Sequence, residues 1–356
     1  MCSKPLLFSR SQLAGQPTSK TVPLMKVLDR PASEYLYAVA GRLLFVTVSD
    51  SRLSQTVSQL FTRWSLDLKE TNGDQPDGRI RFLLESFPFS VIPAHWSTFE
   101  TAEDGRCYTN GDSFYLVFPN TVVLVESAES RSATVWITTL DDCSDIEIAH
   151  SVSFAVCAVL RRCNLFEIHA AGVVAPDDGR TTVIVGPSGS GKSTLSFNLI
   201  KAGWNYLSDD ELLLEEVAGE VQARGFRRFF AVSPDLRVAS VPSSLGNCIQ
   251  GEREANRKDC FDPSTIYPVR ALQSSKPDRL LFVELNRAST SSLTELSSIE
   301  SVSRLIRACP WATYDRAVAR DYLSVISLLA RQTTAFELKA GTDLLSPNTA
   351  SEMLGN

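Results

Sequence analysis

The sequence predicts a smaller α+β domain with an antiparallel sheet, followed by a larger α/β domain. The chain of 356 residues exceeds one typical domain of roughly 100–200 residues. Short β-prone runs separated by turn residues occupy much of 31–143. Beyond them, an apolar run, a glycine-rich loop and a helical stretch follow one another at 181–203. We therefore expect a domain boundary near residue 144.

Composition places the chain among ordinary globular proteins. Hydrophobic residues make up 44% and charged residues 21%, which excludes a disordered chain, a collagen and a coiled-coil rod. The 35 basic and 41 acidic residues give a formal charge of −6, so no nucleic-acid partner is expected. A phosphate ligand remains compatible with this charge, because a few backbone amides and one lysine suffice to bind it.

The sequence predicts a cytoplasmic protein with no membrane partner. Its longest apolar run, Phe154–Leu160, is far shorter than the ~18 residues of a membrane span, and no signal-peptide core is evident. The eight cysteines form no CxxC pair, so a zinc site is not expected. We expect the cysteines to be free thiols in a reducing compartment.

Three segments are expected along the chain. Residues 1–30 are polar and form a loose lead-in. Residues 31–143 form the accessory α+β domain, with a turn near Gly41 between two strands, an amphipathic helix over 51–68 and strands at 113–118, 121–125 and 133–138.

Residues 144–356 form the second domain. It begins with a helix capped by Ser144 and contains strands at 169–174, 181–185, 206–208, 211–217, 221–225, 280–285 and 335–338. Its other helices are expected at 194–202, 299–308 and 316–332, and a functional loop region at 240–278.

A phosphate-binding loop is the strongest motif. The run Gly186-Pro-Ser-Gly-Ser-Gly-Lys-Ser193 matches GxxxxGK[ST] in full, between a predicted strand and a predicted helix. Glycines let the backbone turn its N–H groups inward, Lys192 reaches the β- and γ-phosphates, and the Ser193 hydroxyl ligates Mg²⁺. We expect the nucleotide to be held by Gly186, Pro187, Ser188, Gly189, Ser190, Gly191, Lys192, Ser193 and Thr194. The alternative, a glycine-rich turn that binds nothing, does not explain the strand–loop–helix frame.

Acidic residues follow the predicted P-loop helix. Phosphoryl transfer needs one carboxylate for metal and, with a hydroxyl acceptor, one for its proton. Asp209 and Asp210 end a predicted strand and could serve both needs if the chain bends there, the alternative being a solvated acidic turn. His169 precedes the P-loop strand and is either an active-site residue or a packed structural histidine.

Other charged residues offer competing interpretations. Glu284 ends the apolar run Leu280–Val283, as the acid in the second motif of P-loop ATPases does, although a plain buried strand with a surface glutamate at its end is the favoured interpretation. Two basic clusters are either phosphate-neutralising or solvated: Arg224, Arg227 and Arg228, and Arg253, Arg257 and Lys258.

The constellation of His169, the P-loop, Gly203 and the Asp209-Asp210 pair resembles the catalytic domain of the HPr kinase/phosphorylase family. Asp210 follows Lys192 by 18 residues, as in that family. The resemblance is close over 165–215 and looser over 215–356, where the run Phe336–Leu344 looks like HPr-kinase-related proteins of peptide-modification gene clusters. It implies the P-loop fold of phosphoenolpyruvate carboxykinases, a bent mixed sheet around the P-loop helix.

The resemblance also implies roles for individual residues. Lys192 and its loop would bind ATP, Ser193 and Asp209 would hold Mg²⁺, Asp210 would accept the hydroxyl proton, and His169 would lie near the phosphates. The family's later metal-binding glutamate and late arginine have no recognisable counterpart, so phosphorolysis and recognition of HPr are not expected.

We therefore expect an ATP- and Mg²⁺-dependent serine kinase acting on a peptide or small protein, such as a lasso-peptide precursor. The first domain would bind the acceptor or pair subunits of a homo-oligomer. The alternatives are a P-loop ATPase that uses Glu284 and water, a nucleotide-gated binding module without turnover, and a small-molecule kinase.

Overall fold

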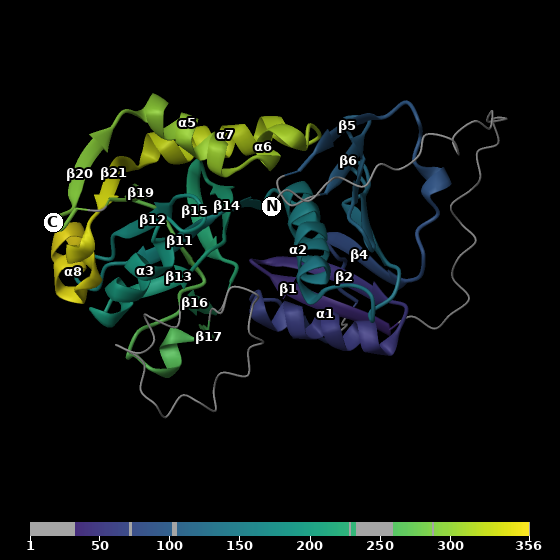
Figure 1. The fold of residues 1–356 in the computed structure, drawn as a ribbon, viewed down its shortest axis with the longest axis horizontal. Coiled ribbons are helices and arrows are strands. Elements are labelled where there is room, and N and C mark those ends of the chain that lie inside the picture. Colours follow the sequence, from purple (N-terminus) through teal and green to yellow (C-terminus); the bar gives the residue numbers. More distant parts are fainter. Residues whose placement is uncertain are drawn as a thin grey trace, which may run out of the picture. The chain divides into compact units, whose positions relative to one another are not determined.

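The computed structural model of the chain describes residues 33–70, 73–101, 105–227, 229–232, 259–286 and 288–355. Its described strands form sheets of nine, six and four strands and one further pair, which makes the protein a mixed α/β protein (Figure 1). The predicted lead-in at 1–30 and the first part of the predicted loop region, 240–258, lie outside the described residues.

The first sheet contains nine strands in the order β3-β1-β2-β4-β9-β8-β7-β6-β5. Their bounds are β1 Ser33–Val39, β2 Arg42–Val48, β3 Asp67–Lys69, β4 Gly78–Leu84, β5 Ser97–Glu100, β6 Arg106–Thr109, β7 Phe114–Val117, β8 Thr121–Val125 and β9 Ser132–Ile137. The predicted turn near Gly41 is confirmed, with Ala40 and Gly41 both at positive φ between β1 and β2. Helix α1 (Ser51–Arg63) is shorter than predicted, because residues 67–69 pair with β1 instead.

The nine-stranded sheet is mixed, so the prediction of an antiparallel sheet is wrong. Strand β4 runs parallel to both β2 and β9. Helix α1 lies between β2 and β4 in the chain and makes the crossover that parallel neighbours require. After β4 the chain starts again at the far edge and returns through antiparallel strands, so β9 arrives beside β4 in the same direction.

Helices α1 and α2 (Asp145–Arg162) share one hydrophobic core with the nine-stranded sheet. Alternate residues of each strand face this core, because side chains point to opposite faces of a sheet in turn. Val46 of β2, Ile80 of β4 and Val135 of β9 are examples. The hydroxyl of Ser144 accepts a hydrogen bond from the backbone N–H of Glu147, which confirms the predicted N-cap of α2. The expected boundary at residue 144 therefore falls at the start of a helix that packs on the preceding sheet.

The six-stranded sheet has the order β13-β11-β12-β19-β21-β20, and the four-stranded sheet has the order β10-β14-β15-β18. Their strands are β10 Phe166–Ile168, β11 Ala170–Val174, β12 Thr181–Val185, β13 Asn205–Ser208, β14 Leu212–Val217, β15 Glu220–Gly225, β18 Ser274–Ser275, β19 Arg279–Leu285, β20 Ser292–Leu296 and β21 Thr334–Ala340. Strand β16 (Phe230–Val232) pairs with β17 (Asp259–Phe261). The helices of this region are α3 Lys192–Lys201, α5 Ser298–Ala308, α6 Trp311–Tyr314, α7 Ala319–Gln332 and α8 Pro347–Gly355.

Helices cover both faces of the six-stranded sheet (Figure 1). Ile184 of β12 points into a core with α3 and α8, whereas its neighbours Val183 and Val185 enter a core with α5 and α7. This alternation follows from the two-residue period of a strand. Because β12 is fully buried between helices, the loop that follows it starts from a rigid support.

A buried charge cluster joins α2 to the segment between α6 and α7. Arg161 and Arg162 of α2 both donate hydrogen bonds to Asp315, and Arg161 also pairs with Glu167 of β10. Arg161 and Asp315 are 0% and 1% exposed. Charges this deeply buried are tolerated only when paired, so the cluster fixes the end of α2 against β10.

Candidate functional site

Strand directions bring the predicted site residues to one edge of the six-stranded sheet. Strands β12 and β13 are both antiparallel to β11, so they run in the same direction, and β19 is parallel to β12. The carboxyl ends of β12, β13 and β19 therefore meet the amino end of β11. The P-loop follows β12, Asp209 follows β13 and His169 precedes β11. In open α/β sheets, ligands bind at the carboxyl ends of the strands.

The P-loop has the backbone of a phosphate cradle. Gly189 and Gly191 adopt φ values of +79° and +93°, which side chains disfavour. At Gly186 a Cβ atom would lie 2.5 Å from the Ser190 hydroxyl and 2.8 Å from the Val283 carbonyl oxygen, so only glycine fits there. Helix α3 begins directly after Gly191 and directs its first N–H groups at the loop. This geometry fits a phosphate chain.

Lys192 is held by the loop and by His169. The residue is 5% exposed, and its ammonium donates to the carbonyl oxygens of Gly186 and Pro187, at 2.8 Å and 3.2 Å. It also lies 3.0 Å from the Nε2 atom of His169. An ammonium only donates, so Nε2 of His169 must be the acceptor and the ring proton must sit on Nδ1.

The protonated Nδ1 of His169 faces Asp210, whose Oδ1 atom is 3.3 Å away. Burial lowers the pKa of His169, the Lys192 and Arg227 charges lower it further, and Asp210 opposes them. The imidazole is therefore neutral at neutral pH and joins Lys192 to Asp210. The structure thus brings together three of the predicted catalytic residues.

The two aspartates after β13 differ in exposure. The chain bends at this point, as a shared site requires. Asp209 is buried at 1% exposure, whereas the Asp210 side chain is 29% exposed and open to a ligand. Ser193 and Thr194, in the first turn of α3, are half-buried.

From the sequence alone, Arg227 is only one member of a basic cluster, and Glu211 has no predicted role. The Nη1 atom of Arg227 lies 3.6 Å from Oδ2 of Asp210, and its Nε atom donates to Glu211 at 3.2 Å. The basic cluster at 224–228 pointed only loosely to Arg227. Its neighbour Arg224 pairs with Glu215 instead. Arg228, Arg253, Arg257 and Lys258 lie outside the described residues.

Glu284 lies one strand away from the P-loop strand. Val185, the last residue of β12, pairs in register with Phe282 of β19. Glu284 therefore lies in β19 just past the part that pairs with β12, beside the loop. Its side chain is exposed. The part of the chain that the structure describes contains no group of three or more His, Cys, Asp or Glu side chains that could hold a metal ion.

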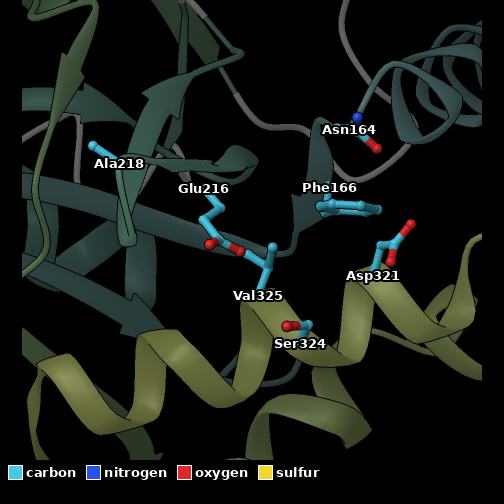
Figure 2. A pocket seen from close by; sticks show the side chains of 7 residues that line it. All are labelled: Asn164, Phe166, Glu216, Ala218, Asp321, Ser324 and Val325. Carbon is cyan, nitrogen blue, oxygen red and sulfur yellow. The ribbon is translucent and has the colours of Figure 1, made fainter.

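A cavity of about 320 Å³ lies elsewhere and shares no residue with the P-loop cluster (Figure 2). It is lined by Asn164, Phe166, Glu216, Ala218, Asp321, Ser324 and Val325. Figure 2 shows Asp321, Ser324 and Val325 on one helix, α7. Its two ionisable groups are both carboxylates, so this cavity does not suit a nucleotide phosphate.

No protein-family model matches the chain, and no curated protein is significantly similar to it. Among the described residues, no helix is both long enough and apolar enough to cross a bilayer. The cysteines at 107, 143, 157, 163 and 309 are buried and free.

Proposed function

We propose that the protein is an ATP- and Mg²⁺-dependent kinase that transfers the γ-phosphoryl group to a serine hydroxyl of a peptide or small protein. One observation carries the proposal: Asp210 is connected through His169 to the P-loop Lys192. A partly exposed carboxylate beside a phosphate cradle is what a hydroxyl acceptor needs as a base. A protein that only bound nucleotide would have no use for it.

The residues of the site suggest how each part would act. The P-loop amides and Lys192 would hold the β- and γ-phosphates, with Lys192 exchanging its loop carbonyls for phosphate oxygens. Ser193 and Asp209 would hold Mg²⁺, which neutralises charge on the phosphates when bound. A hydroxyl and one carboxylate suffice, because Mg²⁺ keeps several waters and takes phosphate oxygens as ligands.

Asp210 would take the proton of the acceptor hydroxyl. Its Oδ1 atom is engaged by His169, which fixes the carboxylate plane and leaves lone pairs for the hydroxyl. The resemblance to HPr-kinase-related proteins favours a serine in a peptide, such as a lasso-peptide precursor, as the acceptor. The nine-stranded sheet and its helices would bind that acceptor or pair subunits of a homo-oligomer, and the protein would act in the cytoplasm.

An ATPase is the second candidate, because Glu284 lies near the carboxyl end of β19, the strand that runs parallel to the P-loop strand. There it could direct a water at the γ-phosphate. The kinase remains the better-supported function, because Glu284 is exposed whereas Asp210 lies 3.3 Å from His169, which in turn contacts Lys192.

The test is transfer from γ-labelled ATP with Mg²⁺ to peptides and small proteins encoded beside the gene. We expect label on an acceptor serine, located by mass spectrometry, and none with the Lys192→Ala variant. Free phosphate without labelled acceptor would favour the ATPase, and nucleotide binding without either product would favour a binding module.

A further inference from the structure

The backbone of Arg227 is fixed against the strand end that carries the aspartates. Gly225 approaches Leu207 so closely that a Cβ atom at residue 225 would lie 2.2 Å from the Leu207 carbonyl oxygen. The hydroxyl of Ser208, which is 0% exposed, accepts from the Arg227 N–H at 3.1 Å and lies 3.2 Å from the Arg227 carbonyl oxygen, to which it donates. Arg227 is therefore anchored to the residue that precedes the aspartate pair.

The Arg227 side chain reaches two carboxylates from this anchor. Its Nε atom donates to Oε2 of Glu211, and its Nη1 atom lies 3.6 Å from Oδ2 of Asp210. Glu211 is itself fixed, because its other oxygen accepts from the Cys157 thiol of α2 at 3.4 Å. The guanidinium is planar and its donors have fixed directions, so it holds both carboxylates at a set separation.

Asp210 thus has a partner on each oxygen. His169 faces Oδ1 and Arg227 faces Oδ2. We propose that Arg227 is a positioning residue for Asp210, which it orients toward the acceptor while Glu211 and Cys157 hold Arg227 in place. This inference rests on the proposed kinase function. Arg227 acts here through Asp210, whereas Lys192 is held by the loop carbonyls of Gly186 and Pro187.

The test compares Arg227→Met and Arg227→Lys with Arg224→Met as the matched control. Arg224 lies three residues earlier, in β15, and pairs with Glu215, outside the site. For Arg227→Met we expect kcat for phosphoryl transfer to fall about 10- to 100-fold, because small misplacements of a reacting group are costly. The KM for ATP should stay within about twofold, since the cradle is intact. Arg227→Lys keeps the charge but cannot span both carboxylates, so it should recover only part of kcat.

Two kinetic outcomes would overturn the inference. One is an unchanged kcat in Arg227→Met with a normal melting temperature. The other is a rise in KM for ATP that accounts for the whole loss of kcat/KM, which would assign Arg227 to nucleotide binding. A loss as large in Arg224→Met would show that the β14–β15 hairpin is merely unstable, and would also count against a positioning role.

A second readout separates this inference from the kinase proposal. The chain has three histidines, so the His169 resonance can be followed in an NMR titration. The Arg227 charge lowers the pKa of His169, so Arg227→Met should raise that pKa and Arg224→Met should not. If the wild type transfers no phosphoryl group but this shift is seen, the kinase proposal fails and the coupling of Arg227 to the Asp210–His169 pair stands. An unshifted His169 overturns the inference itself.

Discussion

The Nζ atom of Lys192 lies 3.0 Å from the Nε2 atom of His169. The other protons of the ammonium go to two loop carbonyls, so all three donors of Lys192 have acceptors within the protein. A nucleotide phosphate must replace at least one of these contacts. In the proposed kinase, occupancy of the cradle would therefore be coupled to the orientation of His169, and through it to Asp210.

Replacing Asp210 with asparagine tests the assignment of the base. The amide keeps the shape of the carboxylate but does not accept a proton, so transfer to the acceptor should fall about 10²- to 10⁴-fold. Nucleotide affinity should change only a few-fold, because Lys192 and the loop amides remain. The rate of acceptor labelling and a titration with a fluorescent ATP analogue measure the two effects.

Asp321→Asn is the matched control for that variant. It removes a carboxylate from the 320 Å³ cavity, which shares no residue with the P-loop cluster, so transfer should be unchanged. Retained transfer in Asp210→Asn would reject Asp210 as the base and leave the P-loop assignment intact.

Replacing Glu284 with glutamine separates the kinase from the ATPase. If Asp210 is the base, the exposed Glu284 contributes little and transfer should stay within about threefold of wild type. Simultaneous assays of labelled acceptor and free phosphate would check this. Loss of phosphate release in Glu284→Gln, with Asp210→Asn nearly as active as wild type, would show that water is the acceptor.

The approach of Gly225 to Leu207 predicts a stability effect. An added Cβ atom would lie 2.2 Å from a backbone oxygen, and neither β15 nor β13 can move without disturbing its neighbours. Gly225→Ala should therefore lower the free energy of unfolding by about 1–3 kcal/mol. Urea unfolding measures this. Gly355→Ala, where the Cβ atom would meet nothing within 4 Å, should change it by less than about 0.5 kcal/mol.

Local features of this site were predictable from the sequence, and features that depend on distant pairing were not. The P-loop, the helix after it and Gly203, whose φ is +96°, all follow from a few adjacent residues. For Asp209 and Asp210 the sequence indicated only that the chain must bend there for a shared site, and the structure has that bend. For His169 the sequence left two interpretations, because only the meeting of β11 with β12 places its ring between Lys192 and Asp210.

The contact of Arg227 with Asp210 needs the β14–β15 hairpin to fold back onto the end of β13, and no local pattern specifies that return. The same limit explains the error about the first sheet. Strands β4 and β9 pair although about 50 residues separate them, and the intervening meander decides their direction. Short exposed strands such as β20 carry little apolar alternation to detect.

The buried cluster around Glu167 predicts a pH-dependent stability. Burial raises the pKa of Glu167 to about 7, although Arg161 opposes this, and Glu211 adds a like charge. Between an ordinary glutamate pKa of about 4.3 and this value, the folded state holds a proton that the unfolded state has lost. The free energy of unfolding should therefore fall as pH rises through this window, by at most about 1.4 kcal/mol per pH unit.

Glu167→Gln removes that proton equilibrium while keeping the side-chain shape. Urea unfolding at pH 5, 6 and 7 should show that the free energy of unfolding depends less on pH in Glu167→Gln than in wild type. The difference in this free energy between the two proteins should therefore change across the window. Glu216→Gln removes an exposed glutamate and should leave the slope as it is in wild type. Parallel curves for Glu167→Gln and wild type would contradict this prediction. They would show that Glu167 is already ionised at pH 5 and that its ion pair with Arg161 persists across the window.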